Sequence, residues 1–220
     1  MPRHDVDQYP EERESGSNLT WLLKNEAAYV EEARRLRQKY QSHIDILVGF
    51  ECDWIRAESQ QLIEDSISRY SYDYFIGSVH HVHTIPIDYD AQMYADAKVA
   101  AGGTDERIFE DYFDAQLQML EAVRPPVIGH FDLIRLKSAN PDGSFKSMQG
   151  VWQRIKRNLD IISSYGGIIE VNTAALRKGM REPYPKQEIM EVIVPFSESM
   201  HPLADFIIDS LGKEYPILPF

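Results

Sequence analysis

The 220-residue chain is 43% hydrophobic and 26% charged, close to globular averages, and its length suits one large domain with a substantial core. A net charge of −12 argues against a nucleic-acid partner, which would need a basic face, although a metal cluster can still attract a small anion. The single Cys52 excludes an internal disulfide and fits a reducing compartment. The lack of about 18 successive apolar residues and of a signal-peptide pattern predicts a cytoplasmic protein that does not enter membranes.

Hydrophobic periodicity predicts helices that alternate with short apolar strands. The clearest helix has apolar side chains at i, i+3, i+4 and i+7, and two prolines stop it. After a loop at residues 1–16, the predicted helices are residues 18–40, 57–70, 105–123 and a segment around 152–162, with a weak one at 203–211. The predicted strands are residues 44–51, 74–80, 127–130 and 168–172, residues 86–90 form an irregular linker and 140–143 form a turn.

This alternation implies a parallel sheet, because parallel strands need crossover connections that are usually helices. Three of the predicted strands end in a potential metal ligand, namely Glu51, His80 and His130. The carboxyl ends of the strands of a (β/α) barrel meet on one rim, where such side chains can surround a cation. Four strands are too few to close a barrel.

Glu51 ends a run that should be buried, where an isolated carboxylate is costly to desolvate. It therefore needs a cation, a hydrogen-bond partner or a place at the strand mouth; a partly exposed glutamate is the simpler alternative. Because side chains alternate along a strand, Phe50 and Cys52 should face the helices if Glu51 faces inward. Cys52 is then expected to be a small core residue rather than a nucleophile.

His80, His81 and His83 form either a metal-binding tract or a polar loop. Alternation sends His80 and His81 in opposite directions, so we expect only one of them to reach the site. His80 is preferred because Gly77 and Ser78 permit close approach of neighbouring groups. His81 is expected in a supporting or loop position.

His130 and Asp132 are two residues apart and should share a face, so Asp132 could orient an imidazole or accept a proton. Glu170 and Asn172 share a face at the next strand end in the same way. The arginines that follow these strand ends, Arg135 and Arg177, could grip a phosphate with their planar guanidinium groups. Solvated loop charges are the alternative for both arginines.

Four motifs, in this order and spacing, resemble the histidinol-phosphatase branch of the PHP (polymerase and histidinol phosphatase) superfamily: Gly49-Phe50-Glu51, Gly77-Ser78-Val79-His80, Gly129-His130-Phe131-Asp132 and Glu170-Val171-Asn172-Thr173. The resemblance implies a distorted (β/α)7 barrel that hydrolyses L-histidinol phosphate, late in histidine biosynthesis, with a cluster of divalent zinc, iron or manganese ions. It implies that Glu51 is a bridging metal ligand and that His80 and His130 are terminal ligands. Arg135 and Arg177 become candidate phosphate ligands, and Asp132 a candidate catalytic residue.

The chain also departs from the family pattern, because the N-terminal His-x-His strand, the second His-bearing strand end and the C-terminal Asp-x-His strand do not occur in it. We therefore expect an incomplete barrel over residues 1–193, a tail unlike the family over residues 194–220, and impaired activity. The alternatives are a PHP phosphoesterase for another small phosphate monoester and a non-catalytic remnant. The pattern makes no prediction about oligomeric state.

Overall fold

The computed structural model describes residues 19–197, so the loop predicted at 1–16, the helix predicted at 203–211 and residues 198–220 of the predicted tail lie outside the described residues. The α-helices are α2 (Leu19–Tyr40), α3 (Ser59–Tyr70), α4 (Ala91–Ala100), α5 (Asp105–Val123), α6 (Gln149–Ser164), α7 (Ala174–Arg177) and α8 (Gln187–Ser197). Two short 3-10 helices are η1 (Leu133–Lys137) and η2 (Phe145–Ser147). The strands are β1 (Gly49–Asp53), β2 (Tyr74–Ser78), β3 (His81–Val82), β4 (Ile85–Pro86), β5 (Val127–Ile128) and β6 (Ile168–Ile169).

The main sheet is parallel, as the alternating pattern predicts, with strand order β1-β2-β5-β6. The predicted strands are longer than the observed ones at all four positions. Residues 44–48 form a link without regular secondary structure in which the Ile44 and Leu47 side chains are exposed, and β1 continues past Glu51 to Asp53. Strands β5 and β6 are each only two residues long.

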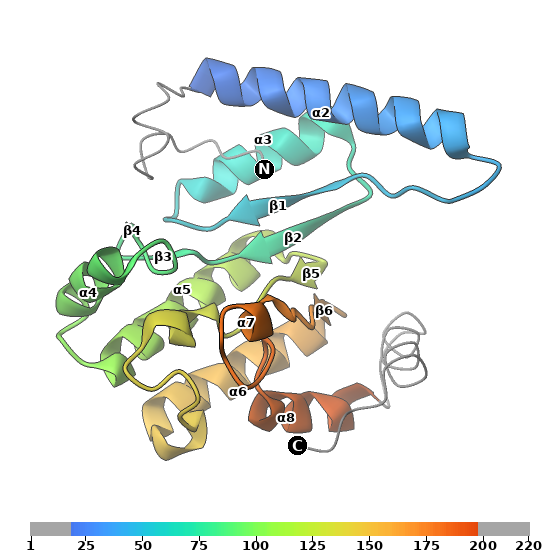
Figure 1. Cartoon of the computed structure of the whole chain (residues 1–220). Coiled ribbons are helices and arrows are strands. Elements are labelled where there is room, and N and C mark those ends of the chain that lie inside the picture. Colours follow the sequence, from blue (N-terminus) through green and yellow to red (C-terminus); the bar gives the residue numbers. More distant parts are fainter. Residues whose placement is uncertain (1–18, 198–220) are drawn as a thin grey trace.

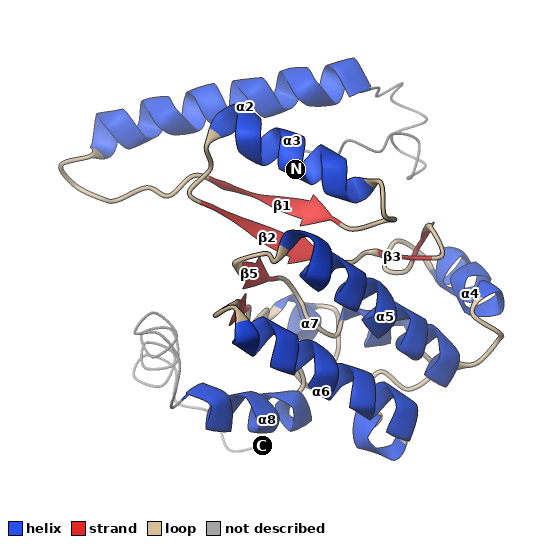
Figure 2. Ribbon diagram, turned by 180° about the vertical axis from the view of Figure 1, so that it is seen from behind, coloured by secondary structure: helices blue, strands red, loops and turns tan. Residues whose placement is uncertain are grey.

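The helices that follow the strands pack side by side in the order α3, α5, α6 and α8, which matches the order β1, β2, β5 and β6 of the sheet (Figures 1 and 2). Successive strands with successive outer helices form an arc of a distorted (β/α) barrel. The long helix α2 lies beside α3 and is joined to it by Glu26, which lies 3.5 Å from Arg69 and accepts a hydrogen bond from Tyr72. Helix α8 runs through the predicted boundary at residue 193.

The two faces of β1 have different environments, and the predicted alternation is confirmed. Phe50 and Cys52 are buried in the core with apolar side chains of the outer helices, among them Ile63, Ile108 and Ile155. Burial raises the pKa of the Cys52 thiol well above its usual range, which suits a core residue. Glu51 and Asp53 project from the opposite face, so β1 carries its apolar contacts on one side and its carboxylates on the other.

The segment between β2 and α5 contains structure that periodicity does not reveal. The β3–β4 hairpin shares only Pro86 with the linker predicted at residues 86–90, and α4 follows that linker; neither element was predicted. The backbone N–H of Met93 donates a hydrogen bond of 2.7 Å to the Asp90 side chain, which caps α4. Only Tyr94 and Ala97 of α4 are buried, so the helix lacks the apolar stripe by which amphipathic helices are recognised. No helix within residues 19–197 combines the length and the apolarity that crossing a membrane requires.

A buried ion pair fixes the segment after β5 to the chain near α8. Asp132 and Arg135 are both completely buried, and Arg135 Nε lies 3.0 Å from Asp132 Oδ2. The other guanidinium N–H groups contact backbone oxygens and one sulfur atom, which belong to Pro141, Met180, Glu182 and Pro183. All five guanidinium donors are thus engaged within the protein. The expectation that Arg135 grips a substrate phosphate does not fit this arrangement, which favours a structural role.

Replacing Arg135 by alanine is expected to lower the free energy of unfolding by about 3–5 kcal/mol, because the change leaves the buried Asp132 carboxylate without its partner. Replacing the exposed Arg177 by alanine removes the same charge and should change stability by no more than about 0.5 kcal/mol. Urea denaturation of both variants and the parent chain measures the difference. Equal losses in the two variants would contradict the structural role of Arg135.

Candidate metal centre

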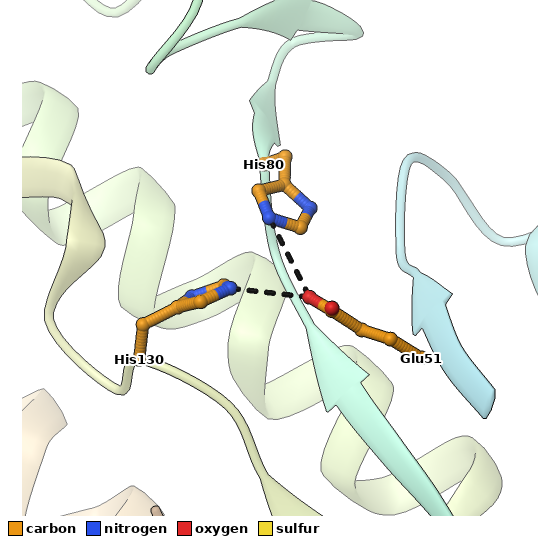
Figure 3. Close-up of side chains that lie close together, drawn as sticks. All are labelled: Glu51, His80 and His130. Carbon is orange, nitrogen blue, oxygen red and sulfur yellow. Dashed lines mark hydrogen bonds and ion pairs between the residues drawn. The ribbon is translucent and has the colours of Figure 1, made fainter. Parts of the chain in front are cut away.

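The three predicted metal ligands lie together at the carboxyl ends of neighbouring strands (Figure 3). Glu51 belongs to β1, whereas His80 and His130 each follow the last residue of β2 and β5 by two positions. Glu51 Oε1 lies 3.2 Å from His130 Nε2 and 3.7 Å from His80 Nε2. One ligand atom from each residue lies within 4.8 Å of the other two. The structure therefore brings together residues separated by up to 79 positions in the chain.

Close backbone approach places His130 at this point. The Gly129 N–H donates a 3.0 Å hydrogen bond to Gly77 O, and a Cβ added to Gly129 would lie 2.6 Å from Ser78 Oγ, so a side chain there would force Ser78 to move. His130 itself has φ of 24°, a conformation that non-glycine residues rarely adopt. Its N–H donates a 2.9 Å hydrogen bond to Glu170 Oε2, so the end of β6 helps to hold the turn.

Glu51 keeps its negative charge although it is largely buried. Burial alone would raise its pKa, but the hydrogen bond with His130 and the charge of His80 lower the pKa below its ordinary value. Burial alone would lower the pKa of His80, but the neighbouring carboxylates, mainly Asp53, raise it to about 9. The site thus concentrates negative charge that protonated imidazoles, or a cation in their place, can compensate.

Asp53 is a component of the site that sequence reasoning missed. Its Oδ1 lies 3.3 Å from His80 Nδ1, and its Oδ2 lies 3.2 Å from His81 Nδ1. Burial would raise the pKa of Asp53, yet these imidazoles hold it far below the usual range. Asp53 is two residues after Glu51, so the alternation along β1 already placed both carboxylates on one face and could have indicated it.

The histidines after β2 occupy positions that simple alternation does not predict. His80 and His81 both reach Asp53, and both lie beyond the end of β2 at Ser78, where the alternation of that strand no longer applies. His81 is completely buried, in keeping with the expected supporting position. His83 is exposed and its Nε2 lies 2.7 Å from Asp111 Oδ2, away from the site.

The structure places Asp132 in the interior and Arg177 at the surface. Asp132 accepts hydrogen bonds from Arg135 and from the backbone N–H of Lys186, which favours a structural role rather than orientation of an imidazole. Burial raises its pKa to about 6 despite the neighbouring guanidinium group. Arg177 is exposed at the end of α7, where solvent and small anions can reach it.

The three residues fit a single divalent cation. Two imidazole nitrogens and one carboxylate oxygen are ligands that zinc and iron both accept, with bonds of about 2.0–2.2 Å for zinc. Ligand atoms within 4.8 Å of one another need only small side-chain shifts to reach that geometry. Within residues 19–197 this is the one cluster of three such side chains that could hold a metal.

Comparison with known proteins agrees with this geometry. A model of the PHP domain matches residues 19–174. The chain is 44% identical to a protein of Schizosaccharomyces pombe named probable histidinol-phosphatase, over 88% of this chain and 63% of that protein. It is 30% identical to histidinol-phosphatase of Saccharomyces cerevisiae, over 90% of this chain and 68% of that protein. The chain thus spans about two thirds or less of the length of these relatives, and it belongs to the PHP domain family.

Proposed function

We propose that this protein is a metal-dependent phosphatase that hydrolyses L-histidinol phosphate to L-histidinol and phosphate. The observation that carries the proposal is the convergence of Glu51, His80 and His130 in a chain of the PHP domain family. The names of the two yeast relatives supply the substrate. The matching cellular role is a late step of histidine biosynthesis in the cytoplasm.

A divalent cation bound there would lower the pKa of a water molecule toward neutrality and polarise a phosphoryl oxygen. The protein's part is to hold the ligands: Glu51 presents an ionised carboxylate, and the two histidines present Nε2 toward it. Glu170 fixes the backbone at His130. Cys52 is buried on the other face of β1, with a thiol that stays protonated, so the proposal assigns the attack on phosphorus to water rather than to this side chain.

Zinc, iron and manganese are the proposed cofactors, and the three ligands should hold one ion per chain. Replacing Glu51 by glutamine should weaken zinc binding by more than the roughly 10–100-fold typical of an outer-shell change, because a direct ligand loses its charge. Replacing His83 by glutamine should have no effect, since His83 pairs with Asp111 outside the site. Competition with a chromophoric chelator measures both affinities. Unchanged zinc affinity in the Glu51→Gln variant would remove the basis for the metal centre.

The chain supplied with zinc, manganese or iron(II) is expected to release phosphate from L-histidinol phosphate faster than from other small monoesters. With three ligands in the described part of the chain, turnover should fall below the roughly 1–1000 per second of typical enzymes. The Glu51→Gln variant should release none. Equal rates on all monoesters would indicate another substrate, and metal binding without any phosphate release would indicate a non-catalytic protein.

We also propose that Arg177 binds the substrate phosphate. Asn172 connects its helix to the site, because Asn172 Nδ2 donates to Glu170 Oε2 and Asn172 Oδ1 accepts from Ala174 N at the start of α7. Glu170 Oε2 is the same atom that holds the backbone of His130. Asn172 and Glu170 thus connect the start of α7, the helix that carries Arg177, to the backbone of His130.

Replacing Arg177 by alanine should weaken inhibition by inorganic phosphate by about 1.5–3 kcal/mol, the usual loss for a charged hydrogen-bonded contact. Replacing the adjacent, equally exposed Lys178 by alanine removes the same charge and should have a smaller effect. Phosphate inhibition constants of the metal-loaded variants test this difference. If the phosphate inhibition constants of the two variants are identical, Arg177 acts only through its charge and does not bind the phosphate directly.

A further inference from the structure

We propose that Asp53 is a positioning residue that determines which nitrogen of His80 faces the metal centre. This inference rests on the metal site of the proposed function and adds a residue to it. Asp53 is not among the side chains that converge on Glu51 Oε1, and it acts through His80.

Asp53 holds His80 through both the side chain and the backbone. Its Oδ1 lies 3.3 Å from His80 Nδ1 and also accepts a 3.3 Å hydrogen bond from the backbone N–H of His80. The strand register supports this contact, because Asp53 pairs with Ser78 and the N–H of the next residue, Trp54, donates to Ser78 O at 2.9 Å. The chain beyond β2 therefore passes directly over the Asp53 carboxylate.

The two nitrogens of the His80 ring face two different carboxylates. Nδ1 lies near Asp53, while Nε2 lies 3.7 Å from Glu51 Oε1 and points into the site. A proton kept on Nδ1 by Asp53 leaves the lone pair of Nε2 for a cation. Carboxylates commonly orient metal-binding histidines in this way, and their loss weakens metal binding by about 10–100-fold.

The second oxygen of Asp53 faces another imidazole. Oδ2 lies 3.2 Å from Nδ1 of His81, whose side chain is completely buried, and the Asp53 side chain is only 6% exposed. The buried position of the carboxylate between two imidazoles disfavours its rotation toward solvent, although Oδ2 makes no well-aligned hydrogen bond with His81. His81 is thereby explained as the residue that fixes Asp53 rather than as a ligand.

His130 provides an internal contrast. Its Nδ1 is buried and has no hydrogen-bond partner within the described residues, so no carboxylate orients that ring in the same way. Its position comes from the backbone, through Glu170 and the turn at Gly129. The side-chain support is therefore specific to His80.

The test compares Asp53→Asn with Asp111→Asn, which breaks another Asp–His pair outside the site. Both replacements keep side-chain size and remove one charge. Zinc affinity, measured by chelator competition, should fall about 10–100-fold in Asp53→Asn and stay unchanged in Asp111→Asn. Equal affinities in the parent and Asp53→Asn would overturn this proposal while the metal site stands, whereas no zinc binding by the parent would overturn both.

A measurement on the unaltered chain keeps the inference testable even where Asp53→Asn fails to fold. Nitrogen-15 NMR of the zinc-loaded chain should show His80 with its proton on Nδ1 and zinc on Nε2. An Asp53→Glu variant, which retains the carboxylate, should keep this tautomer. Zinc bound to Nδ1 of His80 in the parent chain would contradict the assignment.

Discussion

The constraint on which the centre depends is the burial of two carboxylates on one face of β1. Glu51 and Asp53 lie where desolvation disfavours their charged forms, yet both have pKa values below their ordinary range. Imidazoles compensate this charge: His130 and His80 at Glu51, and His80 and His81 at Asp53. Because His80 lies next to both Glu51 and Asp53, the charges of these two carboxylates and of the histidines around them depend on one another.

The parallel sheet brings these carboxylates and histidines together. Parallel strands place all their carboxyl ends at one edge, so residues from β1, β2 and β5 meet although the chain between them forms helices. The outer helices bury the opposite face of β1 through Phe50 and Cys52, which fixes the direction in which the carboxylates point. A shift of β1 by one residue would exchange the two faces and place both carboxylates in the apolar core.

The sequence predicted the directions of side chains correctly within regular strands, where side chains alternate between the two faces of the sheet. Alternation along β1 correctly separated Glu51 from Phe50 and Cys52, and the strand ends correctly predicted which side chains converge. The pattern failed where the backbone leaves regular geometry: beyond Ser78 both His80 and His81 reach Asp53, which alternation forbids. Helix α4 escaped prediction because only two of its side chains are buried, so it carries no apolar stripe.

Arg135 shows why residue type and spacing alone cannot assign a phosphate ligand. Arg135 follows a strand end in the sequence, but its side chain lies in the interior, where it joins Asp132 to the chain around Glu182. A guanidinium group with every donor engaged in the protein supports the fold and has none left for a substrate. The exposed Arg177 has the opposite environment, so exposure rather than sequence position distinguishes the two arginines.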